Sequence, residues 1–282
     1  MTDSFQLIVR FITFVFIFYP TAIGTKTLFP YVWGTTLHAA RISLVFHTNM
    51  RATNSRLSWG AHILGFLLMC WGGSFASHLL LSLPPPQLYA FGPWINYSAV
   101  HLLVTVLFHY LPIPDPSLAN TVLFPFDGLL RANAVIQIVS LLTLPSVNPV
   151  LVASPLFHFI LGAAASASGG LLGGTLSLWT PNWQFSTPPP LRTGVWGLWS
   201  TLDIWAGGAV ASLYGVLTAH PAFLPLRASV TSQALPMSAL DARVVSAMFM
   251  ITMFGLRVFV PAIAPSPKPV PEKRSATKVK TN

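Results

Sequence analysis

The chain has 282 residues, of which 15 are Lys or Arg and 6 are Asp or Glu. The charged fraction of 7% is far below the roughly 25% of soluble proteins, while 53% of the residues are hydrophobic and the mean hydropathy is +0.65. This composition excludes a water-soluble domain, because too few polar side chains are present to cover its surface. The long unbroken apolar runs also differ from the short alternating strands of a membrane β-barrel. The sequence therefore predicts an all-α polytopic membrane protein.

Eight apolar stretches come near the roughly 20 residues that a helix needs to cross the hydrocarbon core. They cover residues 5–23, 28–47, 57–83, 94–111, 118–144, 150–178, 194–219 and 242–264. The first contains Arg10 and Pro20, and it reads either as a poor signal segment or as an extra helix. We favour an uncleaved N-terminal hydrophobic segment within residues 1–27. The other seven stretches form the predicted core, residues 28–264.

Proline clusters separate the core stretches. They lie at residues 84–86, 112–116, 145–149, 188–190 and 221–225. Because proline cannot continue a helix, each cluster predicts a turn at the membrane surface. None of the loops is long enough to fold as a soluble domain, so the function is expected within the membrane or at its surfaces.

Three landmarks occur twice in the same order. They are Leu28-Phe29-Pro30 and Leu123-Phe124-Pro125, Gly72-Gly73 and Gly169-Gly170, and the proline runs 84–86 and 188–190, at offsets of 95, 97 and 104 residues. Chance clustering is the alternative in a chain with 25 Pro and 19 Gly. A duplication predicts two three-helix repeats, residues 28–111 and 118–219, with 242–264 as a seventh helix. Three is odd, so the second repeat enters the membrane inverted, which is a known plan of transport proteins.

Basic residues predict the orientation. With seven spans and a cytosolic C-terminus, and with the N-terminal segment left aside, Arg51, Arg56, Arg192 and the five basic residues of the tail are cytosolic, and only Arg227 and Arg243 face the other side. The tail, residues 265–282, reads as disordered and suited to anionic lipid headgroups. It ends with Lys278 and Lys280 in the spacing of a dilysine retrieval signal, which predicts the endoplasmic reticulum membrane.

Two kinds of residue are candidates for the functional site. The glycine pairs Gly72-Gly73 and Gly169-Gly170 allow either close helix contact or a kink that exposes carbonyl groups to a pathway, and their matched places favour pore hinges. Among charged residues, Asp127, Arg131 and Asp203 fall inside predicted spans, where functional use is expected. A mutual ion pair between Asp127 and Arg131, at positions i and i+4, is the alternative for these two. Arg41 and Arg257 are expected to extend to the headgroups.

Enzymatic and metal sites find little support in the sequence. Eight histidines are scattered without the i, i+4 spacing that places two on one metal, and the single glutamate is Glu272 in the tail. The single cysteine, Cys70, excludes disulfide frameworks and is expected to be a buried apolar side chain. We therefore predict no enzyme activity, no metal site and no nucleic-acid partner.

A series of landmarks over residues 28–260 resembles a known family. They are Phe29-Pro30, Ser58-Trp59, Trp71-Gly72-Gly73-Ser74-Phe75, Phe124-Pro125, the small-residue segment 166–174, and the closing segment 250–259. Their order and spacing, with the lysine-rich tail, resemble the trimeric intracellular cation channel family. The resemblance implies seven helices in two inverted repeats, a pore in each protomer of a homotrimer, and passage of K⁺ and other monovalent cations that balances Ca²⁺ movement.

The family motif in the fourth helix is only partly present. Animal members carry Lys-Glu-Val and a following Arg there, which bind phosphoinositide, whereas this chain has Arg131-Ala132-Asn133-Ala134-Val135. The resemblance makes Arg131 the candidate lipid-binding or gating cation, with an anionic phospholipid as the one ligand to expect besides the ions. Two other functions remain open: a lipid-handling membrane enzyme that uses Asp203 and nearby histidines, and a non-conducting scaffold.

Overall fold

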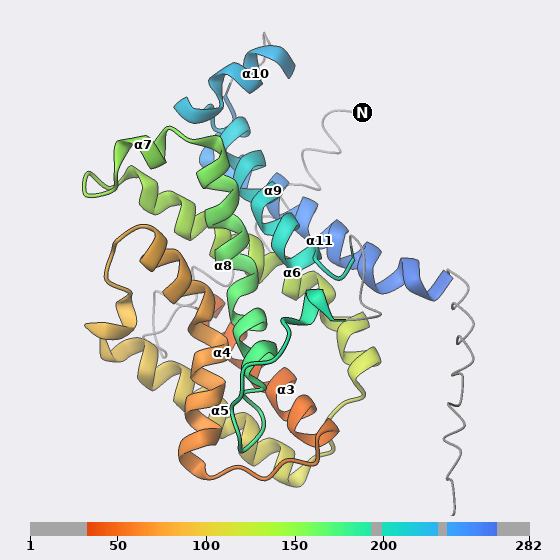
Figure 1. Cartoon of the computed structure of the whole chain (residues 1–282). Helices are drawn as coiled ribbons and strands as arrows, with labels where there is room; N and C mark the ends of the chain where they lie inside the picture. The colour runs from red at the N-terminus through yellow and green to blue at the C-terminus, as the bar shows by residue number, and fades with distance from the viewer. Residues whose placement is uncertain (1–32, 193–198, 231–235, 264–282) are drawn as a thin grey trace, which may run out of the picture.

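The computed structural model describes residues 33–192, 199–230 and 236–263, and its regular structure is entirely helical in these ranges (Figure 1). No strand occurs in the described part of the chain. The predicted hydrophobic segment 5–23 and the predicted tail 265–282 lie outside the described residues. The prediction of an all-α protein is confirmed where the structure describes it.

Seven helices of 16 or more residues occur in the described ranges, and each lies on one of the predicted core stretches. They are α3 (Trp33–Ala52), α4 (Trp59–Leu80), α5 (Phe91–Tyr110), α6 (Pro116–Ser140), α8 (Pro155–Leu176), α9 (Leu202–Leu217) and α11 (Ala239–Ile263). Shorter segments lie in the connections: η2 (Pro86–Leu88), η3 (Leu141–Thr143), α7 (Pro149–Val152), η4 (Pro189–Leu191), η5 (Pro221–Phe223) and α10 (Leu224–Val230).

Five of the seven helices, α4, α5, α6, α8 and α11, are long and apolar enough to cross a membrane, and α9 makes a sixth if it counts together with the segment that follows it at a bend of 94°. The structure thus supports a multi-pass membrane protein with five or six spanning helices, and it does not confirm the predicted seven. Helix α3 falls short in hydropathy because it carries polar side chains that find partners inside the protein. Thr36, for example, donates to Asn96 of α5, and Arg41 pairs with Asp127 of α6.

Polar side chains in the connections cap the starts of three long helices. Asp115 and Ser154 each precede a proline in the first turn of a helix, and their side chains accept backbone N–H groups of that turn. Ser58 caps α4 in the same way. Proline suits this position, since its missing N–H would have no partner in the first turn. The predicted turns at the proline clusters are confirmed between the long helices.

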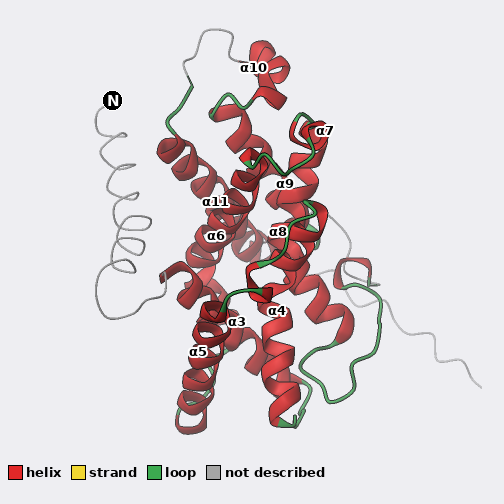
Figure 2. Cartoon of the chain, turned by 90° about the vertical axis from the view of Figure 1, so that its left-hand side faces the viewer, coloured by secondary structure: helices red, strands yellow, loops and turns green. Residues whose placement is uncertain are grey.

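The helices pack around two apolar cores. Helices α3, α4 and α5 enclose one core that contains Phe46, Phe66 and Trp71, and the other core lies among α6, α8, α9 and α11. Figures 1 and 2 show α3, α4 and α5 together towards one end of the molecule and α7 and α10 at the opposite end. Cys70 is buried beside the first core, as the sequence predicted.

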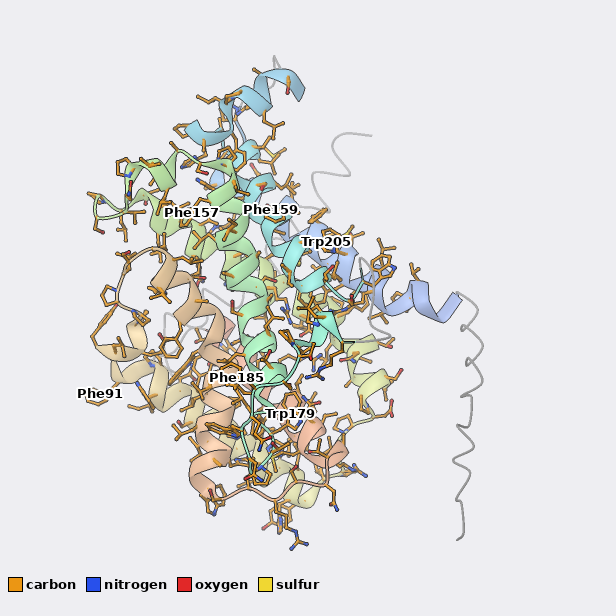
Figure 3. All side chains as sticks on the ribbon, in the orientation of Figure 1. Phe91, Phe157, Phe159, Trp179, Phe185 and Trp205 are labelled. Carbon is orange, nitrogen blue, oxygen red and sulfur yellow. The ribbon has the colours of Figure 1, made fainter. Side chains whose placement is uncertain are left out.

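Helix α5 lies at the edge and turns large apolar side chains outward. Phe91 at its start is 84% exposed and projects from the periphery in Figure 3, and Leu103 is 70% exposed. Such a surface is unfavourable in water and is suited to lipid. By contrast Phe157 of α8 is buried between helices. The exposed face of α5 therefore agrees with a helix at the lipid boundary.

Candidate functional site

The predicted glycine pairs lie where α4 crosses α8. A Cβ atom at Gly72 would lie 2.7 Å from Cα of Gly169, and one at Gly73 would lie 2.5 Å from the carbonyl oxygen of Ala165. A Cβ atom at Gly169 would collide with the carbonyl oxygen of Met69, whereas one at Gly170 meets nothing within 4 Å. Gly72, Gly73 and Gly169 thus let two backbones touch, as in close small-residue helix contacts.

Both helices run without interruption through these glycines. Close packing accounts for three of the four glycines in this conformation, and the hinge role predicted for them stays a prediction. A second crossing of the same kind joins α8 to α9, where Gly162 and Gly207 each face the carbonyl oxygen of the other. Neither residue stood out in the sequence, because Gly162 is a single glycine and the pair Gly207-Gly208 is not among the landmarks that occur twice.

Arg41 of α3 and Asp127 of α6 form a two-point ion pair. The Nε atom of Arg41 lies 2.8 Å from Oδ1 of Asp127, and Nη2 lies 2.7 Å from Oδ2. Nη2 also donates to the side-chain oxygen of Asn120 at 3.0 Å. The two side chains are only 12% and 15% exposed. This paired geometry is the strong form of an arginine–carboxylate contact, and it ties α3 to α6.

A second cluster joins α6, α9 and α11. Nη1 of Arg131 lies 3.2 Å from Oδ1 of Asp203, and Nη1 of Arg257 lies 3.1 Å from Oδ2 of the same carboxylate. Arg131 also donates to the backbone carbonyl of Ser166 in α8. Both guanidinium groups lie over the ring of Phe254, at 5.3 Å for Arg131 and 4.3 Å for Arg257. Two arginines therefore share one carboxylate and one aromatic ring.

These contacts correct three expectations about the charges. Asp127 and Arg131 do not pair with each other across one helical turn, because each meets a partner from another helix. Arg41 and Arg257 do not extend to the headgroups either, since each holds an aspartate. Packing of α6 against α3, α9 and α11 brings these partners closer than any local pairing would.

The place of Asp203 also differs from the expected one. The predicted span 194–219 puts it well inside a helix, but α9 begins at Leu202, so that Asp203 lies in its first turn. A carboxylate there is stabilised by the unpaired N–H groups and the dipole of the helix start. With the two arginines beside it, Asp203 is held as an anion by three separate elements.

The five charged groups are otherwise surrounded by apolar helices. Three arginines and two aspartates leave an excess of one positive charge in what we call the charge network, residues 41, 127, 131, 203 and 257. The arginine–aspartate–arginine part is about one third exposed, at 28% to 33%, in contrast to the Arg41–Asp127 pair. Arg131 turns towards other helices in this arrangement, and its predicted contact with an anionic phospholipid stays a prediction. Lys278 and Lys280 lie outside the described residues.

Three histidines that sequence spacing had left apart meet inside the first core. His47, His62 and His101 come from α3, α4 and α5, and their nearest ring nitrogens all lie within 4.8 Å of one another. The expectation that no metal site exists rested on spacing within one helix, which gives no signal when each ligand comes from a different helix.

No protein-family model, curated protein or solved structure matches the chain. The resemblance to the trimeric intracellular cation channel family accordingly rests on the sequence landmarks alone.

The glycine crossing predicts unequal effects of two neighbouring substitutions. We expect Gly169→Ala to lower the thermal midpoint in detergent, at a cost of about 1–3 kcal/mol, because the added methyl group meets the α4 backbone. Gly170→Ala is the matched control and should leave the midpoint unchanged, because its Cβ has open space. A thiol-reactive dye that labels Cys70 on unfolding reports both midpoints, since this cysteine is single and buried. Equal midpoints for the two variants would contradict the close contact.

The Arg41–Asp127 pair predicts strong coupling. Asp127→Leu and Arg41→Met should each lower stability by about 3 kcal/mol or more, because each leaves one buried charge without a partner. The double variant should recover most of this loss, since two apolar side chains then replace the pair. Thermal midpoints of the four proteins in the cycle measure the coupling. Asp241→Asn is the control, because Asp241 is exposed at the start of α11; additive losses in the cycle would contradict the pairing.

Proposed function

We propose that the chain forms a channel for monovalent cations, K⁺ above all, in an intracellular membrane. The observation that carries the proposal is the charge network within otherwise apolar helices. Lipid cannot solvate ionised side chains, so such residues in membrane proteins pair with one another or border a water-filled path, and they commonly mark ion pathways. The partial exposure of Arg131, Asp203 and Arg257 fits a border of this kind, whereas the closed Arg41–Asp127 pair fits a structural link.

An inverted duplication of three helices supports a transport function. In this proposal α3, α4 and α5 correspond to α6, α8 and α9. Helices α4 and α8 both begin after a capping serine and both carry a histidine as their fourth residue, so that Ser58 and His62 precede Ser154 and His158 by 96 residues. Two of the three corresponding pairs also pack on each other, α4 on α8 and α3 on α6, as helices beside a two-fold axis do. Transporters with inverted repeats place their pathway at such an interface.

The charge network lies beside this interface. Asp127 and Arg131 belong to the first helix of the second unit, and Arg41 belongs to the first helix of the first unit. Helix α11 stands outside the duplication and contributes Arg257. We assign the path to the side of the interface where α6, α9 and α11 meet, because the exposed part of the network lies there.

Orientation, compartment and assembly complete the proposal and rest on sequence features. Arg51 and Arg56 are exposed around the α3–α4 connection, as the positive-inside rule requires of a cytosolic loop. In this proposal a cytosolic C-terminus follows from the same distribution of basic residues. Residence in the endoplasmic reticulum, a homotrimer and a counter-ion role for Ca²⁺ movement follow from the family resemblance.

Electrical recording tests the proposal. Purified protein in a planar bilayer under a KCl gradient should show unitary currents whose reversal potential approaches the K⁺ equilibrium potential. Because the network carries one excess positive charge, anion selectivity is the clear opposite outcome. A reversal potential near that of Cl⁻ would overturn the cation assignment. If intact oligomers pass no current at any voltage, the protein is a non-conducting scaffold and not a channel.

Asp203→Asn tests the role of the network itself. Removing the carboxylate leaves Arg131 and Arg257 without their shared counter-charge, so the local excess rises by one positive charge. We expect a reduced K⁺ current and a reversal potential shifted towards that of Cl⁻. Asp241→Asn, which removes an exposed carboxylate far from the network in sequence, should leave both unchanged. A folded Asp203→Asn protein with the current and reversal potential of the parent would place the path elsewhere.

A further inference from the structure

The first apolar core contains a group of side chains that the charge network does not use. His47, His62 and His101 are 8%, 7% and 0% exposed, and each can direct one ring nitrogen to a common point. They stand on the three helices of the first unit, so that any ligand they share would join α3, α4 and α5 to one another.

Two ring nitrogens of His62 and His101 face each other at a distance close to that between two ligands of one metal ion. Nδ1 of His62 lies 3.0 Å from Nε2 of His101. Two imidazole nitrogens that face each other need either a shared proton or a cation between them. In a tetrahedral zinc site with Zn–N bonds of 2.0–2.1 Å, neighbouring nitrogens are separated by about 3.3 Å. This pair is therefore already near the required separation, and His47 completes a group that spans at most 4.8 Å.

Hydroxyl groups orient two of the three rings. Oγ of Ser43 lies 2.7 Å from Nδ1 of His101, so it can accept that N–H and leave Nε2 with a free lone pair. Oγ1 of Thr105 lies 3.0 Å from Nε2 of His47 and donates its own proton to the carbonyl of His101. Metal-binding histidines are regularly held by such a second hydrogen bond, which fixes the ring and its tautomer.

The surroundings of the three histidines favour a transition-metal ion of intermediate softness. Phe66 stacks on His101 at a centroid distance of 3.8 Å, and Phe46 meets the edges of His62 and His101. The three ligands are neutral imidazoles, a donor set that suits Zn²⁺, Co²⁺, Ni²⁺ and Cu²⁺ and does not suit Ca²⁺ or Mg²⁺. His62 is the fourth residue of α4, one turn from the 53–58 connection, so a water molecule as fourth ligand would enter from that end of the helix.

The second unit offers an internal comparison. His158 takes the place of His62 in α8, and its ring meets His220 with the same 4.6 Å between centroids as separates His62 from His101. Within the described residues, no third ligand joins His158 and His220 in a group of metal-binding geometry. His158 thus also meets one other histidine, which follows the last helix of the second unit, and the third histidine, His47, distinguishes the first unit.

We propose that His47, His62 and His101 form a binding site for one divalent transition-metal ion, Zn²⁺ in particular, with water as the fourth ligand. The ion would bind neutral histidines and clamp the three helices of the first unit. The proposal does not depend on the channel function, because none of the three histidines belongs to the charge network.

Metal analysis of the purified full chain tests the site. After chelator treatment, the detergent-solubilised protein is titrated with ZnCl₂ and with CoCl₂ alone. We expect one equivalent of zinc per chain, and visible absorption bands of tetrahedral Co²⁺ that zinc abolishes. Absence of a stoichiometric, zinc-displaceable Co²⁺ spectrum from the parent protein would overturn the proposal.

Variants assign the ligands. His62→Asn places an amide where Nδ1 lay and can keep the hydrogen bond to His101, so it separates metal binding from folding. His47→Asn removes the third ligand and also gives up the contact between Nε2 of His47 and Thr105. Both should weaken Co²⁺ binding by roughly tenfold or more, and Ser43→Ala by roughly tenfold through loss of the orienting contact. His158→Asn, at the matching place in the second unit, should bind as the parent does. Parent-like Co²⁺ spectra in both His62→Asn and His47→Asn would refute the assignment.

Thermal unfolding followed at Cys70 provides the folding control. Zinc should raise the midpoint of the parent and of His158→Asn, since a ligand that binds only the folded state stabilises it. It should leave the midpoint of folded His62→Asn unchanged. If His62→Asn does not fold, the same measurement on His47→Asn tests the site. An equal zinc-induced rise of the thermal midpoint in His47→Asn and in the parent would count against the site.

Discussion

The cost of placing ionised groups among apolar helices constrains this structure more than any other interaction. An arginine inside a membrane protein needs a counter-charge, hydrogen-bond acceptors or water, and all three arginines of the charge network find an aspartate from another helix. The Arg41–Asp127 pair therefore fixes α3 against α6, and Asp203 fixes α9 against α6 and α11. Each such link specifies one arrangement of helices, because a shifted helix would leave a charge without its partner.

Small residues provide the complementary constraint. Hydrophobic burial gives little preference for one helix contact over another when lipid is as apolar as the side chains, so close backbone approach becomes a main source of specificity. The α4–α8 crossing at Gly72 and Gly169 and the α8–α9 crossing at Gly162 and Gly207 supply it. Helix α8 takes part in both crossings and also receives the Arg131 contact at Ser166. It is the helix that joins the two apolar cores.

The two units of the proposed duplication differ in chemistry. The first unit gathers three histidines around Phe46 and Phe66, whereas the second contributes three of the five groups of the charge network. A Ser cap and a histidine one turn later are common to α4 and α8, yet only the histidine of α4 meets two others. The proposed metal site and the proposed ion path thus lie in different units, and a clamp on the first unit would act on the path only through the α4–α8 and α3–α6 contacts.

Features that depend on composition and on local chain geometry could be predicted from the amino-acid sequence. Scarcity of charge predicted a membrane protein, apolar runs located the seven long helices of the described ranges, and proline clusters marked connections between them. These signals act over one or two helical turns. The glycines of the α4–α8 crossing and three members of the charge network could likewise be found from the chain alone. The partners of these charged residues could not be predicted from the sequence. Asp127 and Arg131 are one helical turn apart but do not pair, because Arg41 and Asp203 approach them from other helices. His47, His62 and His101 gave no signal for the same reason, because only packing brings together side chains whose separation along the chain exceeds any helical period.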